Sequence, residues 1–325
     1  MQGMAFEELF AALTALRLET TELARLRGWI AELKLPGECL ALIEQAAGTP
    51  SCPHCQGTRV HRCGQASGLQ RWRCLACRRS FNALTGTPLA RLRKRELWLP
   101  YLGCVLDSRT IRKAAEQVEV SPSTSFRWRH RFVPGAARER PNALSGMVEA
   151  DETYLLESQK GSRRMNRPPR RRGGVARRRG INREHDCLLI ARDRNRQTFD
   201  FHTGRGPVTA SQLELCLTPV LAPDVLLISD SARAYAAFAA RAGIKHEAVN
   251  LHAGERARGA IHLNNVNGWH ARFKNWLRRF NGVASRYLAH YTGWQRILDD
   301  GHLSSPAHLL RAIVQSTRKH KQQPI

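Results

Sequence analysis

The chain has 325 residues, long enough for two or three domains, and its hydrophobic share of 42% argues against wholesale disorder. Lys and Arg number 52 against 27 Asp and Glu, and the net charge of +25 favours a polyanionic partner: DNA, RNA or an acidic membrane surface. No apolar run approaches the roughly 20 residues that a spanning helix needs, and no signal-peptide pattern is visible. We therefore expect no membrane partner and a cytoplasmic location.

Residues 1–48 are predicted to form an N-terminal helical region. Apolar residues from Phe6 to Leu16 recur at helical spacing, a second helix is expected over 21–34, and Pro36-Gly37 ends it. Nothing in this region carries chemistry, so we expect it to pack against the rest of the protein or to contact DNA.

Residues 49–85 carry two C-x-x-C pairs, Cys52–Cys55 and Cys74–Cys77, with 18 residues between them. This spacing predicts a zinc ribbon, in which four thiolates close a tetrahedral site that is structural because it has no open position. Four unrelated thiols would not pair so regularly. His54 is expected to be a polar neighbour of the site, and Cys63 is either an alternative ligand or a packed thiol. Short strands are expected at 71–73 and 80–82, and the predicted DNA contacts of this region are Arg71 and Arg73.

Residues 94–133 are predicted to be helical and to contain a helix-turn-helix. Ile111 and Ala114 would face inward on the first helix, and Ser121-Pro122 would start the second. The second helix offers Arg127, Arg129 and Arg131 to a major groove. An ordinary helical hairpin remains the alternative, because Glu119 stands where a turn glycine is common. Residues 134–146 are expected to be a linker.

From residue 147 the pattern changes to that of an α/β domain with a mixed sheet, which we place at 147–300. Strands are expected at 147–156, 186–194, 197–203, 224–230 and 246–250, and helices at 211–221, 231–243 and about 264–280. The polar, basic stretch 301–325 is predicted to be a frayed tail.

The segment 160–183 is dense in arginine, proline and glycine, which predicts a mobile loop without a core of its own. Such a charge run is commonly a solvated surface, but its place beside a candidate active site favours contacts with phosphate. The arginines assigned to DNA here are Arg171, Arg172, Arg178 and Arg179.

Two carboxylates, Asp151 and Asp230, stand on predicted strands where chemistry is often found. A carboxylate that closes an apolar strand is costly to bury, and α/β sites form at the carboxyl ends of strands. A pair of carboxylates can share two Mg²⁺ ions that act on a phosphodiester. The alternative for Asp230 is that it caps the next helix. Glu149 and Glu152 are expected to point to the other face of the sheet.

The helix that begins near Asn264 has an apolar face and a polar one. Asn267 and Lys274 are two turns apart and share the polar face, which Arg278 continues. An asparagine oxygen can bind Mg²⁺, and a lysine can contact a phosphate. An ordinary solvated helix face is the alternative.

Taken together, five stretches resemble transposases of the insertion sequence 1595 family, within the DDE transposase and integrase group. The resemblance covers roughly residues 45–300. The stretches are the cysteine ribbon, V-E-A-D-E-T-Y around Asp151, R-R-G-G-V-A-R-R-R-G, I-S-D-S-A-R-A-Y around Asp230, and H-L-N-N-V-N-G-W-H-A-R-F-K from His262 to Lys274.

The resemblance implies a ribonuclease-H-like fold and metal-dependent cutting and joining of double-stranded DNA at element ends and target. Asp151 and Asp230 would be the catalytic aspartates, Asn267 would stand where most relatives have Glu, and Lys274 would be the following lysine. Asp151, Asp230 and Asn267 would hold Mg²⁺ or Mn²⁺. The resemblance further implies a bacterial, nucleoid-associated protein that forms at least a dimer on DNA.

Two other functions remain open at this point. The chain could be a non-catalytic regulator that binds DNA through its ribbon and helix-turn-helix, which the missing carboxylate at Asn267 favours. It could also be a ribonuclease-H-like nuclease that acts on RNA or on repair junctions.

Overall fold

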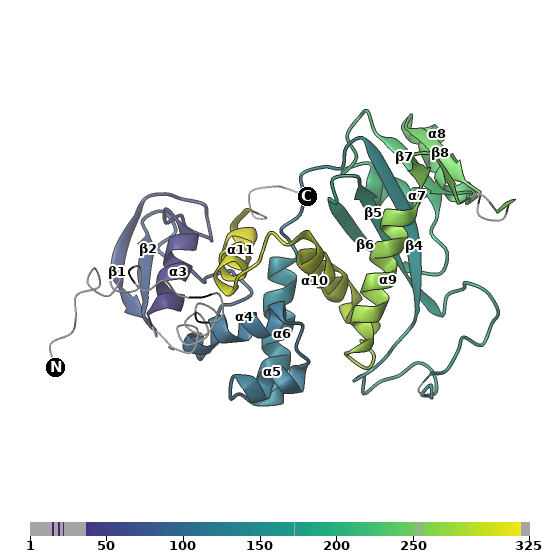
Figure 1. Cartoon of the computed structure of the whole chain (residues 1–325). Helices are drawn as coiled ribbons and strands as arrows, with labels where there is room; N and C mark the ends of the chain where they lie inside the picture. Colours follow the sequence, from purple (N-terminus) through teal and green to yellow (C-terminus); the bar gives the residue numbers. More distant parts are fainter. Residues whose placement is uncertain are drawn as a thin grey trace.

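The computed structural model describes residues 37–171, 173–250, 253–254 and 256–319, together with the isolated positions 15, 19 and 22. The helices predicted between residues 5 and 34 lie essentially outside this part of the chain. The zinc-ribbon region lies at one end of the molecule, the large sheet lies at the other, and a group of helices joins them (Figure 1). None of the described helices is both long and apolar enough to cross a membrane.

The ribbon region is a small antiparallel sheet with one helix packed on it. Two of its strands were predicted, and β1 was not, because its sequence VHRCGQA is mostly polar. Ile43 on the helix and Leu69 on the sheet are fully buried in the same core. The elements are α3 (Glu38–Ala47), β1 (Val60–Ala66), β2 (Leu69–Cys74) and β3 (Ser80–Phe81).

The predicted helix-turn-helix region contains the expected pair of helices, α5 and α6. The Oγ atom of Ser121 accepts a hydrogen bond from the backbone N–H of Thr124 at 3.2 Å, and Pro122 opens α6, as predicted. Glu119 adopts a φ of 55° in the connecting turn, which is the left-handed conformation that glycine commonly supplies there. The elements here are η1 (Arg95–Leu97), α4 (Trp98–Leu106), α5 (Ile111–Gln117) and α6 (Pro122–Ala136).

The predicted linker 134–146 is only partly a linker. Helix α6 continues to Ala136, because Phe132, Val133 and Ala136 form a buried stripe at its end. Leu144 is also fully buried and forms an isolated bridge with Leu221. The free connection between the helical region and the large sheet is therefore short.

The large sheet has five strands in the order β6-β5-β4-β7-β8. The first three strands along the chain are antiparallel, while β7 and β8 run parallel to β4, so the predicted mixed sheet is confirmed. Its strands lie within two residues of the predicted ranges. They are β4 (Met147–Leu156), β5 (His185–Asp193), β6 (Thr198–Arg205), β7 (Leu226–Asp230) and β8 (Lys245–Val249).

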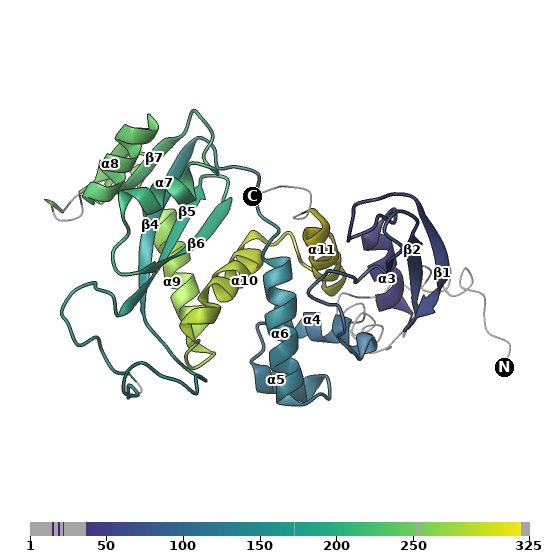
Figure 2. The same cartoon turned by 180° about the vertical axis from the view of Figure 1, so that it is seen from behind.

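Helices cover both faces of this sheet. Val148 and Ala150 of β4 lie in one buried cluster with residues of α7 (Ala210–Leu217) and α8 (Arg233–Ala242). Figure 2 shows these two helices beside the sheet. On the other face, Ile190 and Ile228 pack with α9 (Asn264–Arg278), which crosses β4 in Figure 1. The remaining elements are β9 (Ala257–Arg258), β10 (Ile261–His262), η3 (Ser285–Tyr287), α10 (Leu288–Asp300) and α11 (Pro306–Lys319).

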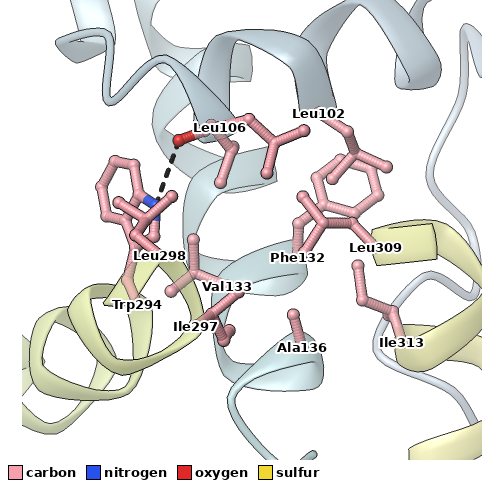
Figure 3. Close-up of a pocket in the computed structure, with 11 residues that line it drawn as sticks. Leu102, Leu106, Phe132, Val133, Ala136, Trp294, Ile297, Leu298, Leu309 and Ile313 are labelled. Carbon is pink, nitrogen blue, oxygen red and sulfur yellow. Dashed lines mark hydrogen bonds between the residues drawn. The ribbon is translucent and has the colours of Figure 1, made fainter. Parts of the chain in front are cut away.

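The prediction of a frayed tail over 301–325 is wrong for residues 306–319. These residues form α11, which packs against α3, α4 and α6. The reason is an apolar stripe inside a basic segment, in which Leu309, Leu310, Ile313 and Val314 are buried. Figure 3 shows Leu309 and Ile313 beside Phe132 and Ile297, around a cavity of only about 10 Å³. Such a space holds no ligand, so α11 completes a close-packed core.

Candidate active site and metal centre

The four predicted zinc ligands come together at one end of the small sheet. Their sulfur atoms all lie within 4.8 Å of one another, with Cys52 Sγ 3.5 Å from Cys77 Sγ and Cys55 Sγ 3.6 Å from Cys74 Sγ. Four sulfurs at about 2.3 Å from a zinc ion would be separated by about 3.8 Å, so the group fits zinc. Among the described residues, no other cluster of three or more His, Cys, Asp or Glu donors is as compact.

The backbone shapes each cysteine pair for metal binding. The N–H groups of Gln56 and Arg78 donate to the carbonyls of Cys52 and Cys74, and both donors have a positive φ, at 63° and 60°. Backbone N–H groups, that of Cys77 first, lower the pKa of the Cys74 thiol to about 7. The turn after Cys74 therefore favours the thiolate that zinc requires at this one cysteine.

Asp151 and Asp230 are neighbours on adjacent parallel strands. The register pairs Glu149 of β4 with Ile228 of β7, so two residues further along each strand bring the two aspartates side by side. Both side chains lie on the face that α9 covers, because each is two positions from a residue of that face. The Asp151 side chain is 22% exposed. Asp230 Oδ1 accepts a hydrogen bond at 3.0 Å from the N–H of Ala232, but Ala232 is itself the N-cap of α8 and no side chain caps this helix, so Asp230 does not take the capping role that was its alternative.

Helix α9 places the other two predicted site residues at the edge of this face. Asn267 and Lys274 are exposed on one flank of the helix, while Trp269 and Phe273 are buried against the sheet. The predicted two-faced helix is therefore confirmed. The structure brings the helix onto Asp151 and Asp230, but it gives Asn267 and Lys274 no direct contact with either aspartate.

The residue of α9 that approaches Asp151 is one that the sequence did not single out, His270. Its side chain is 5% exposed, and its Nδ1 atom lies 3.5 Å from Asp151 Oδ2. Its Nε2 atom is buried and has no hydrogen-bond partner among the described residues. The available signal was a histidine at the edge of the apolar stripe, one turn from both Asn267 and Lys274.

The prediction that Glu149 points to the other face from Asp151 is wrong, because residues two apart in a strand share a face. Its carboxylate is buried and accepts hydrogen bonds from the backbone N–H groups of Asn265 (2.8 Å) and Val266 (2.9 Å). It also pairs with Arg194 and lies 3.3 Å from His262. A carboxylate on the first N–H groups of a helix satisfies them and complements the helix dipole, so Glu149 anchors α9.

Glu152 points to the opposite face, as predicted, and lies behind the aspartates. Its carboxylate accepts a hydrogen bond from the hydroxyl of Tyr235 on α8. Burial raises the pKa of Glu152 to about 7, and the carboxylates of Asp151 and Asp230 add to this rise. The smaller contribution from the two aspartates shows that three carboxyl groups lie near one another at this end of the sheet.

The arginine-rich segment 160–183 is held at its base and is not a loose loop. The buried carboxylate of Glu157 pairs with Arg167 at 2.7 Å and with Arg205 at 2.8 Å, and Arg170 pairs with Glu184 at 2.6 Å. Of the four arginines assigned to DNA in this segment, Arg172 lies outside the described residues. The other three have exposed side chains: Arg171, Arg178 and Arg179.

Helix α6 exposes two of its three predicted DNA contacts. Arg127 and Arg131 are one turn apart on the exposed side. The prediction for Arg129 is wrong, because it lies half a turn away and is 1% exposed. Its guanidinium lies 4.6 Å from the ring of Trp294 and donates to the Arg109 carbonyl at 2.7 Å. In the ribbon, Arg73 is exposed and Arg71 is half-buried.

Comparison with known proteins gives the chain its family. The ISXO2-like transposase domain, the family model of the insertion sequence 1595 group, matches residues 143–294. The chain is 30% identical over 243 residues to an uncharacterized protein in transposable element ISH50 of Halobacterium salinarum, covering 74% of this chain and 82% of that protein.

Two solved structures show a weaker likeness. A pre-cleavage Mos1 transpososome is 15% identical, with 66% of this chain and 77% of that chain covered and a TM-score of 0.24. A Mos1 strand transfer complex is 17% identical, with coverage of 62% and 74% and a TM-score of 0.19. Scores this low carry no weight for the fold, and the family rests on the sequence matches. The chain belongs to the insertion sequence 1595 family of transposases.

Proposed function

We propose that this transposase binds the terminal repeats of a bacterial insertion sequence and catalyses metal-dependent DNA cleavage and strand transfer. The observation that carries the proposal is the placement of Asp151 beside Asp230 beneath α9. The sheet supports a ribonuclease-H-like domain, since three antiparallel strands are followed by two that run parallel to the first, on its other side.

The residues at this end of the sheet suit a divalent cation. Asp151, Asp230 and the amide oxygen of Asn267 would hold Mg²⁺ or Mn²⁺, which supplies activation of the attacking oxygen and stabilisation of the leaving one. Lys274, exposed on the same flank of α9 as Asn267, would hold a phosphate of the substrate. Glu149 keeps the first turn of α9 in place through hydrogen bonds to its backbone.

Double-stranded DNA is the proposed partner, both as element ends and as target. The exposed arginines of the ribbon, of α6 and of the 160–183 segment would contact phosphates, and structural zinc would keep the ribbon in shape. Bringing two ends together requires at least a dimer on DNA, at the nucleoid.

The test uses the full chain with labelled DNA that carries the repeats flanking its own gene, with Mg²⁺ or Mn²⁺. We expect nicking and strand joining, and we expect Asp230→Asn to lower both at least a thousandfold while end binding is kept. Glu214→Gln, an exposed change on α7, serves as the control that should cleave normally. Cleavage at the normal rate by Asp230→Asn would refute the proposed site.

A second function, that of a non-catalytic DNA-binding regulator, is favoured by Asn267 in place of a carboxylate. It predicts specific end binding without cleavage under every metal condition. In that case Asn267→Glu, which restores the charge, should recover cleavage if the chain is a decayed enzyme. Cleavage of RNA duplexes in preference to the element ends would instead favour a nuclease.

A further inference from the structure

The buried imidazole of His270 lacks the hydrogen bonds that its position demands. It lies between Trp269 and Phe273 in the stripe of α9 that packs on the sheet, and its Nε2 atom finds no partner among the described residues. Leaving a buried polar group unsatisfied is unfavourable, and such groups are few in folded proteins. The other ring nitrogen, Nδ1, faces the carboxylate of Asp151, and it is this atom whose role is in question.

The contact with Asp151 has the wrong length for a hydrogen bond and a suitable length for shared coordination. The 3.5 Å between Nδ1 and Oδ2 exceeds the normal range for an N–H···O hydrogen bond. Two neighbouring ligand atoms that each lie about 2.1 Å from an octahedral cation are about 3.0 Å apart at 90°, and they are about 3.5 Å apart when the angle between them opens to roughly 110°. Asp151 and His270 are thus spaced as neighbours around one ion.

We propose that Nδ1 of His270 is a ligand of the divalent cation that Asp151 holds. The inference rests on the proposed function and names a nitrogen ligand that the aspartates and Asn267 do not supply. Asn267 sits on the exposed flank of α9, whereas His270, one turn later, faces the sheet where Asp151 stands. The imidazole of His270 thereby supplies a metal ligand from α9, where a carboxylate at position 267 would otherwise supply one.

A nitrogen ligand changes which metal the site prefers. Mg²⁺ prefers oxygen ligands and keeps its waters, whereas first-row transition ions accept imidazole more readily. The wild-type site should therefore favour Mn²⁺ over Mg²⁺, and removal of the imidazole should narrow that preference. A merely structural histidine would leave the preference unchanged.

The experiment adds Mn²⁺ to the zinc-loaded full chain and records pulsed electron paramagnetic resonance, which detects a directly bound ¹⁴N nucleus. Wild type should show imidazole ¹⁴N coupling, and His270→Leu should lose it while Mn²⁺ affinity falls about tenfold. His270→Asn, which keeps a polar atom near the Nδ1 position, should bind Mn²⁺ with intermediate affinity. Asn275→Ala, on the exposed side of the same helix, is the matched control and should behave as wild type.

The outcomes separate the inference from the proposed function. If His270→Leu and His270→Asn keep the ¹⁴N coupling and the affinity while Asp151→Asn loses Mn²⁺ binding, His270 is not a ligand and the proposed metal site stands. If wild type binds no Mn²⁺ with or without element-end DNA, both are wrong. Thermal unfolding of each variant checks that a lost signal does not come from a lost fold.

Discussion

At Glu149, a single buried carboxylate fixes the start of the helix that covers the candidate active site. It accepts hydrogen bonds from two backbone N–H groups and from Asn265 Nδ2, the last at 2.8 Å, and it pairs with Arg194. Because α9 carries Asn267, His270 and Lys274, a shift at its first turn would move all three. Glu149 is thus a positioning residue, and it touches no reacting atom.

Glu149→Ala should destabilise the protein by about 3 kcal/mol, because it leaves Arg194 and the first N–H groups of α9 without their acceptor. Urea denaturation measures the change. Glu214→Gln on α7 is the matched control, since its ion pair with Arg241 is 3.7 Å long and half exposed, and pairs of this kind contribute at most about 1 kcal/mol. Equal effects of the two variants would contradict the anchoring role.

His130 on α6 gives the protein a predictable response to acid. Burial first, and then the neighbouring charges of His290, Arg129 and Arg286, lower the pKa of His130 from 6.5 to about 4. The folded state thus disfavours the protonated ring, so stability is complete above about pH 6.5 and falls as the pH drops towards 4. We expect a loss of about 1–2 kcal/mol over this window, reduced from the full shift because the ring is partly exposed.

The check compares wild type with His130→Phe. In wild type the ring of His130 stacks on that of Tyr287 with 3.9 Å between the ring centroids, and phenylalanine keeps an aromatic ring in this place. The difference in unfolding free energy between the two should change by this amount between pH 7 and pH 4. Acid release of zinc affects both proteins and cancels in the difference. A difference that is independent of pH would contradict the assigned pKa.

Single residues differed in how far the sequence could reveal them. Asp151 and Asp230 were identifiable because a carboxylate on an apolar strand is conspicuous, and the four cysteines because their spacing is specific. Arg129 could have been excluded by helical periodicity alone. His270 could not be assigned, because its significance depends on the packing of α9 onto β4, which brings together residues distant in sequence.

Among the elements, α11 was the least expected and ties distant parts of the chain together. Gly135 on α6 allows its close approach, since a Cβ atom there would lie 2.7 Å from Ile313 Cγ2. Such a distance is too short for an ordinary side-chain contact. The α6–α11 interface therefore depends on a glycine facing an isoleucine.

Gly135→Ala should cost about 1–3 kcal/mol by overpacking, and Ile313→Ala about 3 kcal/mol by leaving a cavity. The double variant should cost less than the sum, because the added methyl group enters the space that Ile313 leaves. Urea midpoints of the four proteins give the coupling. Gly103→Ala on α4 is the control, since its Cβ would meet Pro306 at an ordinary 3.9 Å. Additive costs would show that the two residues do not touch.

Strands of the large sheet were predictable, whereas α11 and β1 were not. The strands of the large sheet carry apolar runs such as that of β5, in which eight of nine residues are buried. Their apolar composition therefore predicts that they are buried. In α11 and β1 polar residues are about as frequent as apolar ones, and each element packs on partners that the sequence alone does not name.

At the scale of the whole molecule, the net charge of +25 is spread over separate elements, and only some arginines are free to meet DNA. Arg178 and Arg179 are exposed, whereas Arg167 is committed to Glu157 at 2.7 Å. Total charge therefore overstates the number of possible phosphate contacts, because arginines in ion pairs within the protein are not available for them.

Replacing both Arg178 and Arg179 by Gln should weaken DNA binding uniformly across sequences and reduce the slope of log K against log salt by about 2. Binding titrations at several salt concentrations measure the slope. Arg167→Gln removes the same kind of charge but should lower stability and leave the slope unchanged. If both variants change the slope equally, the exposed arginines contact phosphate no more than the ion-paired Arg167 does, and the prediction is wrong.

Because α11 packs against α3, α4 and α6, the helical region can complete its folding only at the end of translation. A ribosome makes the ribbon and α6 first, and at about 5–20 residues per second the residues of α11 follow roughly 10–40 s later. During that interval the large sheet can form, while the apolar side of α6 waits for its last partner. Translation that stops before residue 306 would thus release a chain in which the large sheet is folded and the helical region around α6 is left unfinished.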